Sequence, residues 1–422
     1  TSQARQAYDA LSDDQRRQVS NYDLLVEAEA PGLAEDGGIW LDGAATERRA
    51  VTVRNDTNLT FSDVPILVRL EQAPSERMQF YTTEGERLPS EVETYDADGV
   101  TTVWVRVSEA AAESVTGLWV YFGGSDGEDP AAVWNDDYRL VEHFAGSSED
   151  GGTRPDSTGS QTGTVRGPLA SVNVDGDAAA QFDNTSITYA SIGDDYDRIS
   201  VSAVFSMTQE DLQKLESTGS TGALVSKYLQ GDPTGHNAYL LGVASDGDLY
   251  TDYTCRWWRS NATQHKTYRN DLPAPDGTPH LVTLTYDGFT VGTYLDGEPV
   301  SEETVFIESG TFLDRSIPTV IGAFSDGTEG GFHGTIHEVQ ITGERTNAQW
   351  EAFRYACYLG DAVTVGPAEQ KEGGLTLAAD AAGRGETLTA GQVQIAGVAG
   401  RSGALTADVD GTAVDLGIVP AG

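Results

Sequence analysis

The side chains best suited to ligand recognition lie between positions 250 and 270, in the run YTDYTCRWWRSNATQHKTYRN. The predicted ligand-binding residues are Tyr253, Arg256, Trp257, Trp258, Arg259 and Tyr268, with His265, Lys266 and Arg269 beside them. An exposed aromatic ring can cover the apolar C–H face of a sugar, while arginine donates planar hydrogen bonds to its hydroxyls. The segment therefore predicts a glycan site, and its positive charge favours sulfated or uronic-acid glycans.

Two interpretations of this segment remain open. Because side chains alternate along a strand, Trp257 and Trp258 are expected on opposite faces, one in the core and one exposed. The structural alternative is that a long loop buries both rings and that the arginines pair with nearby aspartates.

Catalysis would require another constellation, because glycoside hydrolysis uses two carboxylates about 5–9 Å apart across a cleft. The nearest candidates are Glu91 and Glu93, two residues apart on an expected strand, and Glu338, which stands alone. We interpret Glu91 and Glu93 as an exposed strand face of an acidic protein. The sequence contains no Glu-x-Asp-x-x-Glu hydrolase motif and no His-x-x-x-His pair on an expected helix. It is therefore predicted not to be an enzyme, and a glycan hydrolase is the less favoured alternative.

Strands must position these side chains. Residues 280–300 alternate apolar and polar side chains and break at Asp287-Gly288 and Asp296-Gly297, which is typical of β-hairpins. The pieces YDG, YLDG, TVIG and GTIHEVQIT follow in order up to residue 342. This succession resembles the laminin-G-like family of concanavalin-type jelly rolls. The resemblance implies a jelly roll over residues 131–365, in a fold that serves lectins, adhesins, hydrolases and spacers alike. The expected strands fill residues 131 to about 345 and fit a sandwich of about twelve strands.

The rest of the chain divides into three parts. Residues 44–125 read as a small β-sandwich that resembles a secreted prokaryotic domain of unknown function, which commonly precedes laminin-G-like domains on cell-surface and viral adhesive proteins. Residues 1–43 are predicted to form a helical N-terminal arm. Residues 366–422 contain no aromatic residue and are expected to form a β module that joins an assembly. The predicted fold class is all-β, with short N-terminal helices.

The resemblance also implies one Ca²⁺ near the rim of the jelly roll. The positions that match its contributors are Asp156, Asp183 and Glu338, the last of which is more often aspartate in the family. Glycosylation sequons occur at Asn55, Asn58, Asn184 and Asn261. Cys255 and Cys357 are either one disulfide or two thiols, since a single pair carries no framework information.

The net charge of the protein limits the kinds of partner that it can bind. The 422 residues carry 66 acidic and 26 basic side chains, a net charge of −40, which disfavours binding to nucleic acid or anionic membranes. The composition resembles that of halophilic proteins. The sequence contains no run of 18 apolar residues, so no membrane-spanning helix is predicted. We expect an extracellular adhesion protein, on a cell surface or a viral tail fibre, that binds a cell-surface glycan or glycoprotein and associates with other subunits, as a homo-oligomer. The alternative is a purely structural subunit of a filament or virion without a ligand.

Overall fold

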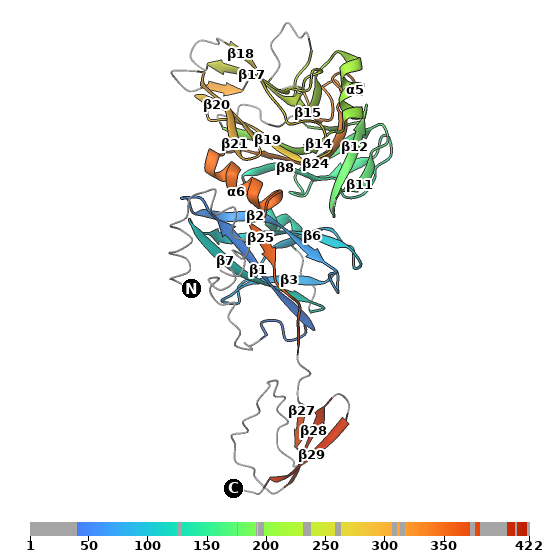
Figure 1. Ribbon diagram of the computed structural model, residues 1–422, viewed down its shortest axis with the longest axis vertical. Helices are drawn as coiled ribbons and strands as arrows, with labels where there is room; N and C mark the ends of the chain where they lie inside the picture. The colour runs from blue at the N-terminus through green and yellow to red at the C-terminus, as the bar shows by residue number, and fades with distance from the viewer. Residues whose placement is uncertain are drawn as a thin grey trace.

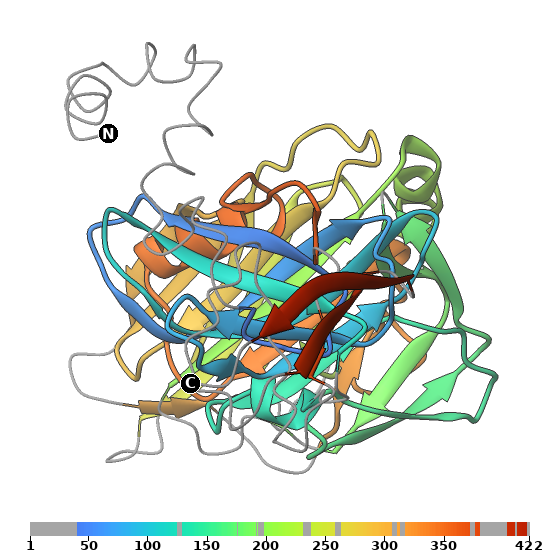
Figure 2. The same cartoon turned by 90° about the horizontal axis from the view of Figure 1, so that it is seen from below.

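The computed structural model describes residues 40–124, 129–174, 176–190, 192, 198–230, 238–257, 263–305, 310–312, 317–371, 376–379, 403–409 and 412–419. They form two β-sandwiches stacked along the long axis, followed by a short antiparallel sheet (Figures 1 and 2). The predicted all-β class is confirmed. Most of the helical arm predicted for residues 1–43 lies outside the described residues. No helix of the described chain is both long and apolar enough to cross a membrane.

The small sandwich consists of two antiparallel sheets. The first has the order β25-β1-β7-β3-β4, with β26 also paired to β1. Its strands are β1 (Glu47–Asn55), β3 (Met78–Thr82), β4 (Arg87–Leu88), β7 (Ser114–Phe122), β25 (Val363–Val365) and β26 (Glu369–Gln370). The second sheet contains β2 (Phe61–Glu71), β6 (Val100–Ala110) and β5 (Ser90–Thr94). Alternate apolar residues of both sheets, including Val51, Ile66, Phe80, Val105 and Val120, fill the space between them.

The boundary predicted at residue 365 is wrong, because the chain returns to the small sandwich after the jelly roll. Val365 pairs with Val51 and Gln370 pairs with Glu47, so β25 and β26 belong to the first sheet. Without β25, strand β1 would be an open edge, which sheet proteins avoid. The jelly roll is therefore inserted between β7 and β25 and is connected to the small sandwich at both ends.

The jelly roll consists of two larger sheets, ordered β18-β17-β16-β15-β23-β13-β10-β9 and β11-β12-β24-β14-β19-β20-β21. β22 (Gly310–Phe312) pairs with β17, and β8 (Tyr138–His143) pairs with β24. The first sheet contains β9 (Thr153–Pro155), β10 (Thr162–Arg166), β13 (Ser186–Tyr189), β15 (Gly222–Lys227), β16 (Tyr239–Val243), β17 (Leu249–Trp257), β18 (Thr263–Asn270) and β23 (Thr319–Ile321). The second contains β11 (Ala170–Val174), β12 (Asp177–Asp183), β14 (Ile199–Ser206), β19 (His280–Tyr286), β20 (Thr290–Leu295), β21 (Glu298–Thr304) and β24 (His333–Thr342). The described strands outnumber the twelve expected.

The predicted hairpins are confirmed. β19 pairs with β20 across Asp287-Gly288, and β20 pairs with β21 across Asp296-Gly297. Asp296 and Gly297 have φ values of 51° and 82°. Two successive residues in the left-handed region match the turn type that joins tightly connected strands, which explains the Asp-Gly pair.

Three helices of the described chain complete the molecule: α4 (Pro130–Val133), α5 (Gln209–Thr218) and α6 (Ala348–Tyr358). Helix α6 lies between the two sandwiches (Figure 1). Its Phe353 and Cys357 belong to the core of the small sandwich, while Glu351 accepts a hydrogen bond of 2.8 Å from Thr283 of the jelly roll. Cys357 is a buried free thiol rather than half of a disulfide, and burial raises its pKa. The C-terminal sheet contains β27 (Thr376–Ala379), β28 (Gly403–Val409) and β29 (Thr412–Val419).

Candidate functional site

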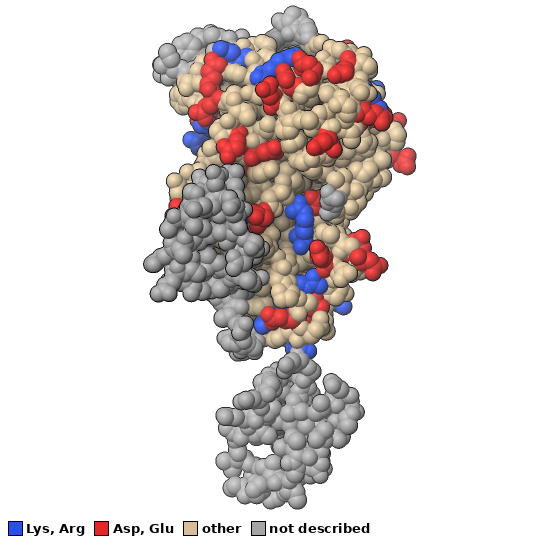
Figure 3. Space-filling model, viewed as in Figure 1, with Lys and Arg blue, Asp and Glu red and all other residues tan. Residues whose placement is uncertain are grey.

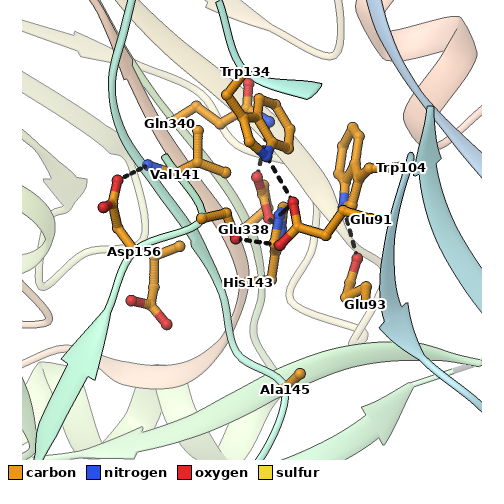
Figure 4. Close-up of polar contacts among 12 residues, drawn as sticks. Glu91, Glu93, Trp104, Trp134, Val141, His143, Ala145, Asp156, Glu338 and Gln340 are labelled. Carbon is orange, nitrogen blue, oxygen red and sulfur yellow. Dashed lines mark hydrogen bonds and ion pairs between the residues drawn. The ribbon is translucent and has the colours of Figure 1, made fainter. Parts of the chain in front are cut away.

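A histidine and three glutamates meet in the seam, the interface between the two sandwiches (Figure 4). His143 of β8 lies with its Nδ1 2.5 Å from Oε2 of Glu338 in β24. Its Nε2 lies 3.6 Å from Oε2 of Glu91, which β5 supplies together with Glu93. Gln340 donates a hydrogen bond of 2.8 Å to the other oxygen of Glu338. We refer to His143, Glu91, Glu93 and Glu338 as the seam cluster.

Two tryptophans enclose the seam cluster. Trp134 donates through Nε1 to Glu91 at 2.7 Å, and Trp104 donates to Glu93 at 2.8 Å. The Trp104 ring also stacks on the imidazole of His143, with a centroid distance of 5.3 Å and an interplanar angle of 22°. Each ring therefore excludes water from the cluster and supplies a hydrogen bond to a carboxylate that burial would otherwise leave poorly solvated.

Burial and the charges of neighbouring side chains shift the pKa values of the seam cluster in opposite directions. Burial alone would lower the pKa of His143, but the carboxylates of Glu338 and Glu91 raise it well above the usual value. Burial raises the pKa of Glu338, and it raises the pKa of Glu93 to about 7. Burial also favours a higher pKa for Glu91, yet the contact with His143 lowers it. A protonated His143 can thus neutralise only part of the cluster, and Glu93 holds a proton up to near neutral pH.

The interpretation of Glu91 and Glu93 as an exposed strand face is wrong. The Glu91 side chain is 13% exposed, and Glu93 is buried. The reason is that the jelly roll covers this face of β5, which the sequence of β5 does not reveal. Glu338 and His143 are also buried. The cluster bridges the two sandwiches, because Glu91 and Glu93 come from β5 and His143 and Glu338 come from β8 and β24.

Other contacts strengthen the seam. Arg69 of β2 forms a bidentate ion pair with Asp177 of β12, at 2.8 and 2.5 Å. The same guanidinium donates a hydrogen bond of 2.8 Å to the carbonyl of Tyr358 in α6. Apolar side chains from both sandwiches pack around these charges: Leu67, Trp104, Val133, Trp134, Val141, Val204, Leu281 and Tyr358. The two sandwiches therefore share a small core of their own.

The three carboxylates predicted to bind Ca²⁺ are each engaged by protein groups. Asp156 is buried and accepts hydrogen bonds from the backbone amides of Val141 and Gln161. Asp183 lies 2.9 Å from Nδ1 of His333, and Glu338 belongs to the seam cluster. Within the ranges that the structure describes, no three His, Cys, Asp or Glu side chains gather as metal ligands would. The proposed trio does not fit the oxygen cage that Ca²⁺ requires.

The predicted ligand-binding segment is only partly described. Trp258 and Arg259 lie outside the described residues, and of Arg256 and Trp257 only the backbone in β17 is described. Tyr253 is buried and its ring stacks on that of Tyr268 at 5.8 Å. Tyr253 is therefore a core residue and does not form a platform for a sugar.

Each basic residue of this segment whose side chain is described has an acidic partner. Nε2 of His265 lies 2.8 Å from Asp252, and Nζ of Lys266 lies 2.9 Å from Glu303. Arg269 forms an ion pair with Asp246. Figure 3 shows basic and acidic side chains lying side by side at this end of the molecule. For Arg269 the structural alternative, in which the arginines pair with nearby aspartates, is the one observed.

The sequons also differ in accessibility. Asn55 is buried, and its side chain donates hydrogen bonds to the carbonyls of Leu59 and Ala110, so it cannot accept a glycan in the folded protein. Asn58 and Asn184 are exposed, whereas Asn261 lies outside the described residues.

A pocket at the rim of the jelly roll, beside the predicted segment, was not foreseen from the sequence. It has a volume of about 410 Å³ and lies between the end of β14, helix α5, the β16–β17 turn and the β18–β19 connection. Its apolar lining includes Phe205, Met207, Leu212, Leu272 and Pro273. Its polar lining includes Asp246, Asp248, Asp271, Thr278 and His280. We call this cavity the rim pocket. In the sequence, this pocket is indicated only by Asp246, Asp248 and Asp271, which lie just before and just after the predicted ligand-binding segment.

His280 is held in a defined orientation at the edge of the rim pocket. Its Nδ1 lies 2.7 Å from Oδ2 of Asp296, the residue that also begins the β20–β21 turn. Within the described chain, no protein group hydrogen-bonds its Nε2. This nitrogen is therefore available to a ligand.

Residues 189–350 match the family Laminin_G_3, described as the Concanavalin A-like lectin/glucanases superfamily. Solved structures similar to this chain include the binding domain of Paraclostridial Mosquitocidal Protein 1, with 13% identity, a TM-score of 0.39 and coverage of 52% of each chain. Domain 4 of AbnA, a GH43 extracellular arabinanase from Geobacillus stearothermophilus in complex with arabinotriose, has 16% identity and a TM-score of 0.34, covering 52% of this chain and 98% of that one.

A third is the ligand binding domain of Botulinum neurotoxin serotype D in complex with N-acetylneuraminic acid, with 11% identity, a TM-score of 0.38 and coverage of 68% of this chain and 74% of that one. The chain spans about half the length of the first of these structures. Comparison with curated proteins gave no match. The region matched by the family lies within the jelly roll, and the resemblance of that domain to concanavalin A-like lectin and glucanase domains is thereby confirmed.

Proposed function

We propose that this protein is an extracellular recognition protein whose jelly roll binds a cell-surface glycan in the rim pocket. The observation that carries the proposal is the composition of this pocket. It joins an apolar surface, made by Phe205, Met207 and Leu272, to a polar edge that contains His280 and Asp271. Its volume of about 410 Å³ lies within the range of roughly 300–1,000 Å³ typical of small-ligand sites.

Each part of the pocket suits one part of a sugar. The apolar residues offer a surface for the C–H face of the ring, whose burial is favourable. Carboxylates accept hydrogen bonds from hydroxyl groups, and the fixed imidazole of His280 can donate or accept one. The pocket lies on a rigid sandwich, so a ligand would meet groups that are already in place.

We further propose that the protein binds its glycan without cleaving it. Glu91, Glu93 and Glu338 lie together in the seam cluster, where Trp134 donates to Glu91 and Trp104 donates to Glu93. Their role in joining the sandwiches supports binding rather than hydrolysis.

Binding at the rim pocket is tested by Asp271→Asn, which removes one exposed carboxylate. Asp98→Asn is the matched control, because Asp98 is also exposed but lies in the small sandwich. On a glycan array and by calorimetry with the best glycan, Asp271→Asn is expected to weaken binding roughly tenfold, since hydrogen bonds to charged groups contribute about 1.5–3 kcal/mol. If both variants bind the glycan as tightly as the parent protein, the glycan site lies outside the rim pocket. Substitution of Trp258 and Arg259, from the segment predicted from the sequence, would then be the next test.

An assembly role is the second candidate. Figure 1 shows β17, β18 and α5 at one end of the long axis and β27–β29 at the other. This arrangement supports a subunit that joins a fibre or virion through its C-terminal sheet and presents the rim pocket at the distal end, as part of a homo-oligomer. Light scattering of the full chain and of a chain ending at residue 371 tests it: the shorter chain is expected to be monomeric.

Adaptation to high salt is a further part of the proposal. At a net charge of −40, mutual repulsion of surface carboxylates destabilises the compact state, and molar salt shortens the Debye length to about 3 Å. We expect the melting temperature, followed by circular dichroism, to rise by several degrees or more between about 0.1 M and 2 M KCl. A melting temperature that stays constant over this range would contradict halophilic adaptation.

A further inference from the structure

We propose that the rim pocket selects sugars carrying a protonated amine over neutral and anionic sugars, an inference that rests on the proposed function. Three aspartates, Asp246, Asp248 and Asp271, line the pocket. No Lys or Arg is found among its described lining residues. The pocket is therefore negatively charged where a ligand would enter, and its charge complements a cation.

The guanidinium of Arg269 lies beside these aspartates, and its positive charge offsets only part of their negative charge. Arg269 forms an ion pair with Asp246 and lies 3.9 Å from Asp248. Burial would raise the pKa of Asp246, but the hydrogen bond from Arg269 lowers it, so both partners are ionised. Three carboxylates against one guanidinium leave a net negative charge. An anionic sugar that approached Arg269 would also meet the carboxylates of Asp246 and Asp248 beside the guanidinium.

Two carboxylates remain for a ligand. The Asp248 side chain is 36% exposed, and its ion contact with Arg269 is long. Asp271 is exposed, and no hydrogen bond to its side chain occurs within the described chain. An ammonium group has three donors and no acceptor, so it can bridge carboxylates that would repel a sulfate or a uronic acid. At the rim pocket we therefore expect a cationic ligand, whereas the preference for anionic glycans predicted from residues 250–270 concerns a different site and stays a prediction.

The rest of the pocket argues for a sugar amine rather than a simple ammonium ion. A small cation needs no apolar surface, whereas Phe205, Met207 and Leu272 line this pocket. The Nε2 of His280 provides a directional partner for a ring hydroxyl, because Nδ1 is held by Asp296. A hexosamine with a free amine presents an apolar ring face, hydroxyls and one positive charge, and thus uses all three features.

The test compares two disaccharides that differ only at the nitrogen: the disaccharide of glucosamine and its N-acetylated form. By calorimetry at pH about 6, where the amine is charged, the free amine is expected to bind about tenfold more tightly, a difference of about 1.4 kcal/mol. Asp271→Asn and Asp248→Asn are each expected to reduce this preference to about threefold or less. The Asp98→Asn control is expected to keep it.

Salt separates a specific contact from general attraction to an acidic protein. A direct contact between an ammonium group and a carboxylate is screened less than attraction over a longer distance, so part of the preference is expected to persist in about 2 M KCl, where non-specific binding of cations disappears. Equal binding of the two disaccharides would overturn this inference and leave glycan binding in place. No binding of either disaccharide or of any arrayed glycan would overturn both proposals. Tighter binding of an oligolysine peptide, lost in Asp271→Asn, would assign the pocket to a basic protein segment instead.

Discussion

Replacing His143 by leucine is expected to lower the free energy of unfolding by about 3–5 kcal/mol, since removing one partner leaves a buried charge without compensation. His143 is the cation between Glu338, at 2.5 Å, and Glu91, at 3.6 Å. Without it, Glu338 keeps only the hydrogen bond from Gln340. Guanidinium chloride unfolding followed by tryptophan fluorescence measures the loss, because Trp104 and Trp134 border the cluster.

A double-mutant cycle separates the loss of the ion pair from the loss of packing. Glu338→Leu alone removes the carboxylate that the imidazole contacts most closely, and His143→Leu with Glu338→Leu removes the buried charges of that pair together. Apolar replacements of a whole buried pair are often neutral or stabilising, so the double variant is expected to recover most of the stability. Losses below about 1 kcal/mol in both single variants would show that the pair does not hold the seam.

The parent protein is expected to lose stability as pH rises, because Glu93 is buried. The variant Glu93→Gln is expected to lose less stability over the same pH range. Burial raises the pKa of Glu93 from 4.5 to about 7. Between these values the folded protein keeps a proton that the unfolded chain releases, so stability falls as pH rises. The loss is complete above pH 7 and amounts to about 3 kcal/mol, at 1.36 kcal/mol per pKa unit.

The neighbours of Glu93 decide the shape of this pH profile. Its charged neighbours are His143, which lowers its pKa, and Glu338 and Asp177, which raise it. The raised pKa of His143 acts in the same direction, because its contribution is present below pH 6.5 and is lost as pH rises through the folded value. In Glu93→Gln the amide oxygen can still accept from Trp104. We expect its melting temperature to vary less between pH 5 and 8 than that of the parent, whereas Glu298→Gln on exposed β21 should leave the profile unchanged. Parallel profiles for Glu93→Gln and the parent would refute this assignment.

The two predictions concern the same structural element. The jelly roll is tied to the small sandwich by two chain connections, by the Arg69–Asp177 ion pair and by the seam cluster. These connections fix the orientation of the jelly roll relative to the small sandwich.

Local chemistry made part of this structure predictable. The hairpins over residues 280–304 follow from strand alternation and from Asp-Gly turns, and the left-handed φ values of Asp296 and Gly297 are a property of those two residues alone. The all-β class follows from repeating such local signals along the chain, whereas the jelly roll was expected from the resemblance to the laminin-G-like family.

The sites could not be predicted in the same way. Glu91 and Glu93 have the i, i+2 spacing of an exposed strand face, and only docking of His143 and Glu338, some 50 and 245 positions further along, buries them. From the sequence, Arg269 is expected to belong to a basic ligand-binding patch. In the structure, Asp246 forms an ion pair with it, and Asp246, Asp248 and Asp271 make the adjoining rim pocket acidic.

The sequence by itself thus determined the strands, their turns and the excess of negative charge, because these depend on neighbouring residues and on composition. Tertiary structure alone decided which carboxylates are buried, which cations are free to act and where a pocket forms. Burial and pairing are contacts between distant segments, and the electrostatic energy of a charge depends on those contacts more than on its place in the chain.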